Sequence, residues 1–542
     1  MIKVLSFGCP ATKDILDYNP FNNNRNYSLT YHKGYQAIPE LNLLLDEIVP
    51  DSTNVVLFDF VSEAMFGTVY QNEKVTTRNF WIKNWGSEQV YTSTDFEATF
   101  GIWKKEVAKF IQYFLEKNIV LVLNSFRFSP EMVIDNENPQ PTSKEYPTVE
   151  KQEYYNQFLQ KAEKYVEEKF PQVKIIKFNQ SSKVEKNHPI KAYSFYLNED
   201  YYLDSFVQFE TLIKERFPKE ITDYKFYDLN ENTNFENEIY DGSIILINYL
   251  YSGKGNILNA AWHHSEINDF LTKSSVNDYI LDGQYGNIYR FIPRKSFYRK
   301  SLKEFTSSHN EKIFFSDVSD PIRLKSKRVK NIVFFFMGMP GGKTVNNANA
   351  LFRLNPHLFN NFTRSLVKDT VVIRIADVNG VRGSFYVNSY NYSTYEDDLS
   401  EFLENMISTY NVDRDNVTLH GTSKGGVGAL FYGSKHKLKS VSVDPVLDGD
   451  WVIKNQKNNH FVDGFRNKTD LVPTINNYLT DNKAETYVVG NHYVDNTWKI
   501  LEKLVGVKLM DIDDSTVINH QQISPNCVPE WLMLINKMLL NL

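Results

Sequence analysis

The sequence predicts an α/β protein, because short apolar runs alternate with amphipathic stretches of helical period along most of the chain. A length of 542 residues exceeds one ordinary domain, and 42% hydrophobic residues are enough for several buried cores. We expect two α/β domains, at residues 1–215 and 329–542. A smaller β-rich domain or insert, residues 216–328, separates them.

Residues 1–215 contain four strand-like runs, each bounded by polar or turn residues: IKVLSFG, NVVLFDF, IVLVLNSF and VKIIKFN. Between them lie amphipathic stretches, ATFGIWKKEVAKFIQYFLEKN and EYYNQFLQKAEKYVEEKF. The first carries apolar side chains on one helical face, namely Phe100, Trp103, Val107, Phe110, Ile111 and Phe114. This alternation predicts a parallel, three-layer domain.

Residues 216–328 change character, with β-rich runs and turn signals in YDGSIILINYLYSGKGN and NIYRFIP and no obvious long helix. Residues 329–542 alternate again. The strand candidates there are NIVFFFMG, TVVIRIAD, NVTLHG, KSVSVDPV and ETYVVG. The helix candidates are EDDLSEFLENMISTY and PEWLMLINKMLLNL.

Composition excludes several functional classes. The formal charge of −6 gives no general basic field for nucleic acid or an anionic membrane. Two cysteines, Cys9 and Cys527, exclude a disulfide framework and a Cys-rich metal site. The N-terminus lacks a secretory signal, and the longest apolar runs are about half a membrane span. We expect a soluble cytoplasmic protein with no membrane span, and peripheral contact with the inner face of the membrane stays open.

The segment NVTLHGTSKGGVGALFYG carries a Gly-x-Ser-x-Gly pattern between a strand and a helix. That context is typical of a nucleophile elbow. Small residues at Gly421 and Gly425 let strand and helix approach, and the turn presents the hydroxyl of Ser423. The helix N-terminus then supplies N–H groups for an oxyanion. The alternative is a tight turn whose glycines serve packing alone.

An oxyanion loop is expected after an earlier strand, and NIVFFFMGMPGGKT contains Gly338, Gly341 and Gly342 there. We predict that the backbone N–H groups of Met339 and Lys424 hold the oxyanion. The alternative for this loop is an ordinary strand-end turn. Its Gly-Lys-Thr ending is not a phosphate-binding loop, because Met337 stands where that motif needs glycine. No metal cluster is visible.

A triad in this architecture follows the order serine, acid, histidine. His520 lies shortly before the final helix, and we favour it as the base over His492. For the acid we favour Asp495, which follows the strand YVVG, and Asp444 is the alternative. Three further aspartates are weaker candidates: Asp511, Asp513 and Asp514.

Polar and aromatic residues follow another strand in VVIRIADVNGVRGSFYVNSYNY. Asp377, Asn379, Arg382 and Tyr386 would line the mouth of the site, which suits a sugar or another polar acceptor. The alternative is a solvated loop.

The segments IRIADVNGVRGSFYVN and HGTSKGGVGALFYG resemble the C-terminal domain of XcbB/CpsF-type capsular polysaccharide biosynthesis proteins. They are similar, more distantly, to the accessory Sec glycan O-acetyltransferase family, whose acid can be glutamate. The resemblance implies an α/β-hydrolase-like domain in which Ser423, an acid and a late histidine move or remove an acyl group on a glycan. It implies no tightly bound cofactor, an acyl donor such as acetyl-CoA as substrate, and a glycan or glycan precursor as acceptor. Capsule-assembly or secretion proteins are the partners that it suggests.

The N-terminal region resembles an SGNH-related domain of bacterial polysaccharide-biosynthesis proteins, with an SGNH- or flavodoxin-like three-layer fold. Gly8 occupies the serine position of the first motif block, and Lys13 replaces its arginine. Asp59 and Glu63 match the second block. A third block matches loosely, with His188 retained and Tyr196 in place of a histidine. The lost serine and histidine imply a non-catalytic, binding or scaffold domain.

Together these observations predict a serine-dependent acyltransferase, in particular an O-acetyltransferase, or an esterase acting on a bacterial capsule or cell-surface glycan. The alternative is a non-catalytic partner of a capsule-assembly or secretion complex that retains a hydrolase fold.

Overall fold

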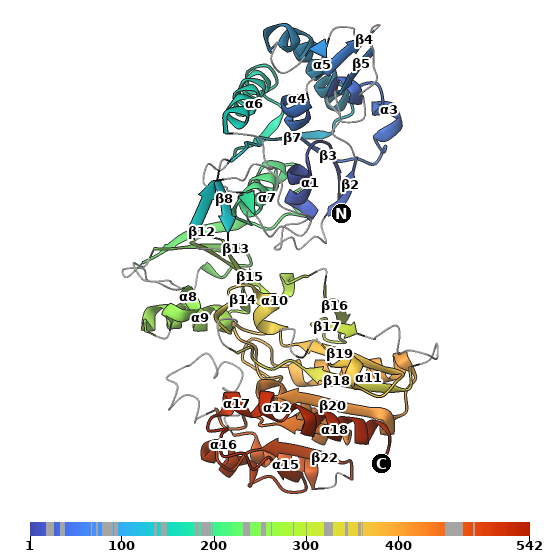
Figure 1. Ribbon diagram of the computed structural model, residues 1–542, viewed down its shortest axis with the longest axis vertical. Coiled ribbons are helices and arrows are strands. Elements are labelled where there is room, and N and C mark those ends of the chain that lie inside the picture. The colour runs from blue at the N-terminus through green and yellow to red at the C-terminus, as the bar shows by residue number, and fades with distance from the viewer. Residues whose placement is uncertain are drawn as a thin grey trace. The chain divides into compact units, whose positions relative to one another are not determined.

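The computed structural model divides the chain into two compact units, Met1–Thr222 and Asp223–Leu542. Figure 1 shows the chain coloured from its N-terminus in blue to its C-terminus in red. The structure describes residues 1–17, 27–32, 38–66, 68–71, 74–77, 90–91, 96–129, 131–134, 138–141, 149–178, 184–185, 197, 199–230, 239–250, 256–261, 263–285, 287–299, 301–318, 329–341, 345–355, 359, 361–449, 470–480 and 483–542.

The first unit is built on a five-stranded parallel sheet in the order β10-β7-β3-β1-β2. Its strands are β1 (Ile2–Ser6), β2 (Tyr27–Tyr31), β3 (Val55–Phe58), β7 (Val120–Asn124) and β10 (Lys174–Ile176). Four of them confirm the predicted apolar runs, whereas β2 was not predicted. All four residues of β3 are buried. Since neighbouring side chains on a strand point to opposite faces, both faces of the sheet are covered.

Helices complete this unit, and the long helix α5 confirms the predicted apolar face. The helices are α1 (Pro10–Asp17), α2 (Ile38–Leu41), α3 (Leu45–Ile48), α4 (Val61–Phe66), α5 (Phe96–Glu116), α6 (Val149–Lys169) and α7 (Glu199–Ile213). On α5, Trp103, Val107 and Phe110 are buried in the unit's core. Two small sheets are also present: β5-β4-β6 (Lys74–Thr77, Thr68–Gln71, Val90–Tyr91) and β11-β8-β9 (Val184–Glu185, Glu131–Ile134, Asn138–Pro141).

The second unit begins with a four-stranded sheet in the order β12-β13-β15-β14. Its strands are β12 (Tyr224–Leu229), β13 (Ile244–Tyr249), β14 (Tyr279–Tyr285) and β15 (Ile288–Pro293). Helices α8 (Ile257–Ala260) and α9 (Ser265–Val276) and the 3-10 turn η2 (Arg294–Ser296) accompany it. The β-rich character was predicted. The 12-residue helix α9 was not.

An eight-stranded sheet, in the order β16-β17-β19-β18-β20-β21-β22-β23, forms the rest of this unit. Its strands are β16 (Lys303–Thr306), β17 (Lys312–Val318), β18 (Asn331–Phe336), β19 (Thr370–Ala376), β20 (Val417–Thr422), β21 (Lys439–Val443), β22 (Thr486–Gly490) and β23 (Lys508–Asp511). The pairings of β16 with β17 and of β17 with β19 are antiparallel, and the others are parallel. This sheet begins at Lys303, earlier than the start expected at residue 329.

Alternate residues of β18 enter two different cores. Ile332, Phe334 and Phe336 pack in one cluster with α11 and α12. Val333 and Phe335 pack in another with the final helix. Helices therefore cover both faces of the sheet, which makes three layers. The helical elements are α10 (Ala350–Leu354), η4 (Thr363–Ser365), α11 (Tyr395–Tyr410), η5 (Arg414–Asn416), α12 (Lys424–His436), α15 (Val472–Leu479), α16 (Asp495–Leu501), α17 (His520–Asn526) and α18 (Val528–Leu539).

The chain was also searched for helices that could enter a lipid bilayer. None of the helices in the described part combines the length and apolar character that a bilayer-crossing helix needs.

Candidate active site

Ser423 stands at a sharp turn between β20 and α12, the context that the Gly-x-Ser-x-Gly pattern predicted. Its backbone has φ 53° and ψ −116°, in the left-handed half of the map that non-glycine residues avoid. Its N–H donates to the carbonyl oxygen of Val443, at 2.9 Å, on the neighbouring strand β21. This strained backbone places the serine at the carboxyl end of the sheet, between the strand and the helix N-terminus.

The two glycines that flank Ser423 are required by close backbone approach. A side chain at Gly421 would overlap the backbone of Gly425, and one at Gly425 would overlap the carbonyl oxygen of Phe336. The first turn of α12 therefore lies directly against β20 and against the end of β18. A larger residue at either position would force strand and helix apart, and the serine would move with them.

His520 is the first residue of α17, and the structure brings it to Ser423. Its Nε2 lies 2.7 Å from the Ser423 Oγ, although 97 residues separate the two in the chain. The His520 side chain keeps 25% of its surface exposed. A half-buried imidazole in contact with a serine hydroxyl has the geometry of a general base.

Asp444, directly after β21, holds the other side of the imidazole. Its Oδ2 lies 2.6 Å from Nδ1 of His520, and its side chain is almost completely buried. β20 and β21 are neighbours and parallel, so their carboxyl ends place Ser423 and Asp444 side by side. Ser423, His520 and Asp444 thus form one continuous chain of contacts.

The expectation that Asp495 orients His520 is therefore wrong. Asp495 begins α16, its side chain is 70% exposed, and it binds Lys499 one turn further along the same helix, at 2.6 Å. An acidic residue in the first turn of a helix is favoured by the helix dipole alone. The sequence signal for Asp444 was its position, with no intervening residue, at the end of the strand next to that of Ser423.

The remaining histidine and aspartate candidates form a separate group. Nδ1 of His492 contacts the Asp511 Oδ2 at 2.7 Å, and Asp513 lies 3.9 Å from the same nitrogen. Asp514 accepts hydrogen bonds from Thr516. The contacts of these residues complete an exposed loop structure after β22 and β23, and His520 is not among them.

Two opposing effects set the pKa of His520. Burial disfavours the charged imidazolium and lowers the pKa, while the hydrogen bond and negative charge of Asp444 raise it. Asp444 prevails, and the pKa of His520 lies above its ordinary value. Asp444 therefore stabilises the imidazolium that forms when the serine gives up its proton.

The backbone segments predicted to hold an oxyanion lie beside the serine. Lys424 begins α12, and an N–H at this position has no acceptor within its helix. A Cβ on Gly425 would lie 3.0 Å from the Gly338 nitrogen, so the loop that contains Met339 runs against the same helix turn. Gly342, also named for this loop, lies outside the described residues.

Four residues predicted to line the mouth of the site are buried instead: Asp377, Asn379, Arg382 and Tyr386, each at most 2% exposed. Both readings of this segment, an acceptor-binding mouth and a solvated loop, are wrong for that reason. Alternating polar and aromatic letters do not distinguish a surface loop from a buried network. Only the contacts of these side chains reveal the difference.

The first unit has its own polar cluster at the ends of β1 and β3. Gly8 has φ 116°, and a side chain there would overlap the Asp59 carboxylate. That carboxylate accepts hydrogen bonds from the backbone N–H groups of Cys9 and Val61, each at 2.8 Å, and from the hydroxyl of Thr12. No hydroxyl can stand at position 8 without moving Asp59.

The other members of the predicted N-terminal blocks divide into two sets. Glu63 is buried and accepts the backbone N–H of Ile38 at 2.8 Å. Burial raises its pKa to about 8. His188 and Tyr196 lie outside the described residues.

Metal and sequence-family searches add no ligand. Within the described ranges, no group of three or more His, Cys, Asp or Glu side chains is arranged to hold a metal ion. No protein-family model matches the sequence, and no curated protein matches it either.

Solved structures with a similar fold include esterases and acyltransferases. The Glycosylation Associate Protein (Gap123) complex from Streptococcus agalactiae is 16% identical with a TM-score of 0.32, over 47% of this chain and 50% of that one. The present chain thus spans half the length of that protein. A ferulic acid esterase is 14% identical with a TM-score of 0.33, over 44% and 97% of the two chains. The capsule O-acetyltransferase of Neisseria meningitidis serogroup A is 14% identical with a TM-score of 0.32, over 44% and 96%.

Proposed function

We propose that this protein is a serine-dependent acyltransferase or esterase. The observation that carries the proposal is the continuous contact chain from the Ser423 Oγ through the two ring nitrogens of His520 to the Asp444 carboxylate. A strained serine at a strand–helix turn, an imidazole on its hydroxyl and a buried carboxylate behind that imidazole are the parts that acyl transfer requires.

The first half of the proposed reaction forms an acyl-enzyme. Nε2 of His520 takes the proton of Ser423 while Oγ attacks the carbonyl carbon of the acyl donor. The carbonyl oxygen becomes an oxyanion, which the backbone N–H groups of Met339 and Lys424 bind. The imidazolium then gives its proton to the leaving group, and the donor's acyl bond breaks.

The second half reverses these roles with a different nucleophile. A hydroxyl group, from water or from a sugar, gives its proton to His520 and attacks the Ser423 ester. Water yields an esterase, and a sugar hydroxyl yields a transferase. The resemblance carried by HGTSKGGVGALFYG and IRIADVNGVRGSFYVN supports O-acetyl transfer to a capsule or cell-surface glycan. Acetyl-CoA would then be a substrate and not a resident cofactor.

The first unit has a supporting role in this proposal. Gly8 stands where the SGNH-type motif has its serine, and Asp59 occupies the space that a side chain would need. A unit that cannot present a hydroxyl at this place binds or positions other molecules and does not hydrolyse them.

The proposal is tested by p-nitrophenyl acetate turnover and by fluorophosphonate labelling of the full-length protein. We expect the wild type to turn over the ester and to carry the label on Ser423, and Ser423→Ala to lose both. Ser365→Ala, at an exposed serine of the same unit, is the matched control and should behave as wild type. Equal rates for the wild type and Ser423→Ala would support the alternative, a non-catalytic partner in a capsule-assembly or secretion complex.

The acceptor is identified in a second experiment. The glycan from cells that carry Ser423→Ala is compared by mass spectrometry with the glycan from wild-type cells. O-acetyl groups missing from the variant's glycan indicate transfer, whereas additional O-acetyl groups indicate an esterase. An unchanged glycan would contradict the assigned substrate class.

A further inference from the structure

A buried loop follows β19 and contacts both segments of the proposed oxyanion hole. We call residues 377–386 the Asp377 loop. Loops are normally exposed, because a buried loop must find partners for all of its polar groups. Asp377 and Tyr386 at its two ends are fully buried, as is Arg382 to within 2%.

The first contact is an ion pair with the residue after the nucleophile. The Lys424 Nζ lies 3.2 Å from the Asp377 Oδ2, and both side chains are completely buried. The same ammonium group donates to the Arg382 carbonyl oxygen at 3.2 Å. Since the backbone N–H of Lys424 is a proposed oxyanion donor, this pair connects that donor's residue to the loop. A buried charge without its partner is strongly unfavourable, so the pair restrains the first turn of α12.

The second contact reaches the other oxyanion segment. The hydroxyl group of Tyr386 lies 2.9 Å from the Met337 carbonyl oxygen and 3.0 Å from that of Ile375. Met337 ends the β18 run two residues before Met339. One loop therefore contacts the backbone on both sides of the position where an oxyanion would develop.

The loop holds its own shape through strained backbone. Phe385 and Tyr386 have φ 57° and 64°, values that bulky residues adopt only when their surroundings enforce them. The N–H of Phe385 donates to the Asp377 Oδ2 at 3.0 Å. A Cβ on Gly383 would lie 2.6 Å from the Lys424 Nζ, so the ion pair fills the space beneath the loop. The Asp377 carboxylate is the group that the strained turn and the lysine share.

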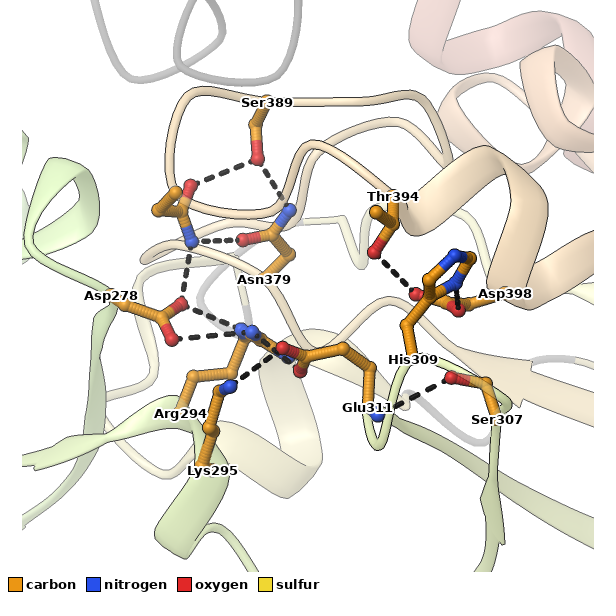
Figure 2. A network of polar contacts seen from close by, with 11 residues as sticks. Asp278, Arg294, Lys295, Ser307, His309, Glu311, Asn379, Ser389, Thr394 and Asp398 are labelled. Carbon is orange, nitrogen blue, oxygen red and sulfur yellow. Dashed lines mark hydrogen bonds and ion pairs between the residues drawn. The ribbon is translucent and has the colours of Figure 1, made fainter.

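The smaller sheet of the same unit supports the loop from its other side. The hydroxyl of Ser275 on α9 accepts the N–H of Val381 at 3.2 Å. Figure 2 shows a polar network in which the carboxylate of Asp278 connects through an asparagine to Asn379. That asparagine is Asn391, whose amide donates to both residues. The segment that precedes the large sheet thus fixes the position of the loop.

We propose that Asp377 is a positioning residue for acyl transfer. Its carboxylate holds the Lys424 ammonium group, and through it the Lys424 N–H, where the oxyanion forms. The inference rests on the proposed function. It implies that losing the carboxylate weakens binding of the transition state while binding of the substrate changes little, because only the tetrahedral oxyanion needs that N–H.

The test compares Asp377→Asn with a matched control, Asp398→Asn. Asp398 is also fully buried, and its carboxylate binds His309 and Thr394 at the start of α11, as Figure 2 shows. Both variants lose a buried carboxylate, and both should unfold at a lower temperature. We expect kcat for p-nitrophenyl acetate to fall about 10- to 100-fold in Asp377→Asn, with KM within about twofold. Asp398→Asn should keep both constants.

A boronic acid inhibitor supplies a readout that a merely structural role would not move. Phenylboronic acid forms a tetrahedral adduct on an active serine, so its affinity reports on the oxyanion hole. We expect its inhibition constant to rise in Asp377→Asn by about the same factor as kcat falls, and to stay unchanged in Asp398→Asn. Unchanged kcat and boronate affinity in a folded Asp377→Asn would overturn the positioning role and leave the proposed function intact.

A double variant covers the case in which Asp377→Asn does not fold. Asp377→Asn combined with Lys424→Met removes both charges, so no buried charge is left unpaired, and stability recovers. The Lys424 N–H remains but loses its anchor, and kcat should stay at least about fivefold below wild type. Wild-type kcat in the folded double variant would refute the inference. Absence of Ser423-dependent turnover in the wild type would overturn both this inference and the proposed function.

Discussion

The Oδ2 of Asp444 lies 2.6 Å from the Nδ1 of His520, across 76 residues of chain. The contact exists because β21 pairs with β20 in parallel, so that the carboxylate emerges beside the nucleophile's strand. His520 then reaches both from the opposite end of the unit's sequence, at the start of α17. The acid thus belongs to the strand adjacent to that of Ser423 and not to the penultimate strand.

Asp444→Asn should lower kcat by roughly 10³- to 10⁴-fold while the protein stays folded, because the amide no longer stabilises the imidazolium or holds its tautomer. The measurement is ester turnover at saturating substrate. Asp495→Asn is the control and should match wild type, since Asp495 contacts Lys499 on its own exposed helix. A larger loss in Asp495→Asn than in Asp444→Asn would reverse the assignment.

The pH dependence of kcat/KM should report the raised pKa of His520. The base must be neutral to accept the serine proton, so the rate rises as pH increases through this pKa, which lies above 6.5. Asp444 raises this pKa and burial lowers it. In Asp444→Asn the acidic limb of the residual rate should therefore move to lower pH. A limb that stays in place would show that another group controls the profile.

Gly425→Ala should damage both stability and turnover. The added methyl group would overlap the Phe336 carbonyl oxygen, so α12 must shift away from β18 and carry Ser423 with it. We expect a lower melting temperature and at least a tenfold loss of kcat, by about the cost of displacing a reacting group. Gly101→Ala is the control, because a methyl group there meets no atom within 4 Å. It should stabilise α5 by about 0.5–1 kcal/mol.

Glu63 should make the first unit less stable as pH rises from 4.5 to about 8. Its native pKa is raised to about 8 by burial, so the native state keeps a proton that the unfolded state has released. The loss is about 1.4 kcal/mol for each pH unit in this window. Glu63→Gln carries no titrating proton and should flatten the dependence, as measured by hydrogen exchange of peptides from β1 and β3. An unchanged pH slope in this variant would contradict a neutral Glu63.

Local patterns in the sequence predicted a large part of the fold. The apolar face of α5 is buried as its helical period indicated, and the runs NVVLFDF and NIVFFFMG became the central strands β3 and β18. Strand β2 and helix α9 escaped prediction, because neither has a strong apolar period of its own. Their places depend on the neighbours against which they pack.

For the candidate site, the sequence by itself determined the turn at Ser423. Steric limits among residues 421–425 act over a few peptide units, and a Gly-x-Ser-x-Gly pattern expresses them directly. Chain order then selected His520. Only the tertiary structure decided that Asp444 supplies the carboxylate and that Asp377 lies beneath Lys424. Those two contacts depend on which strand ends are neighbours and on where each side chain points, and both are set by packing between segments far apart in the chain.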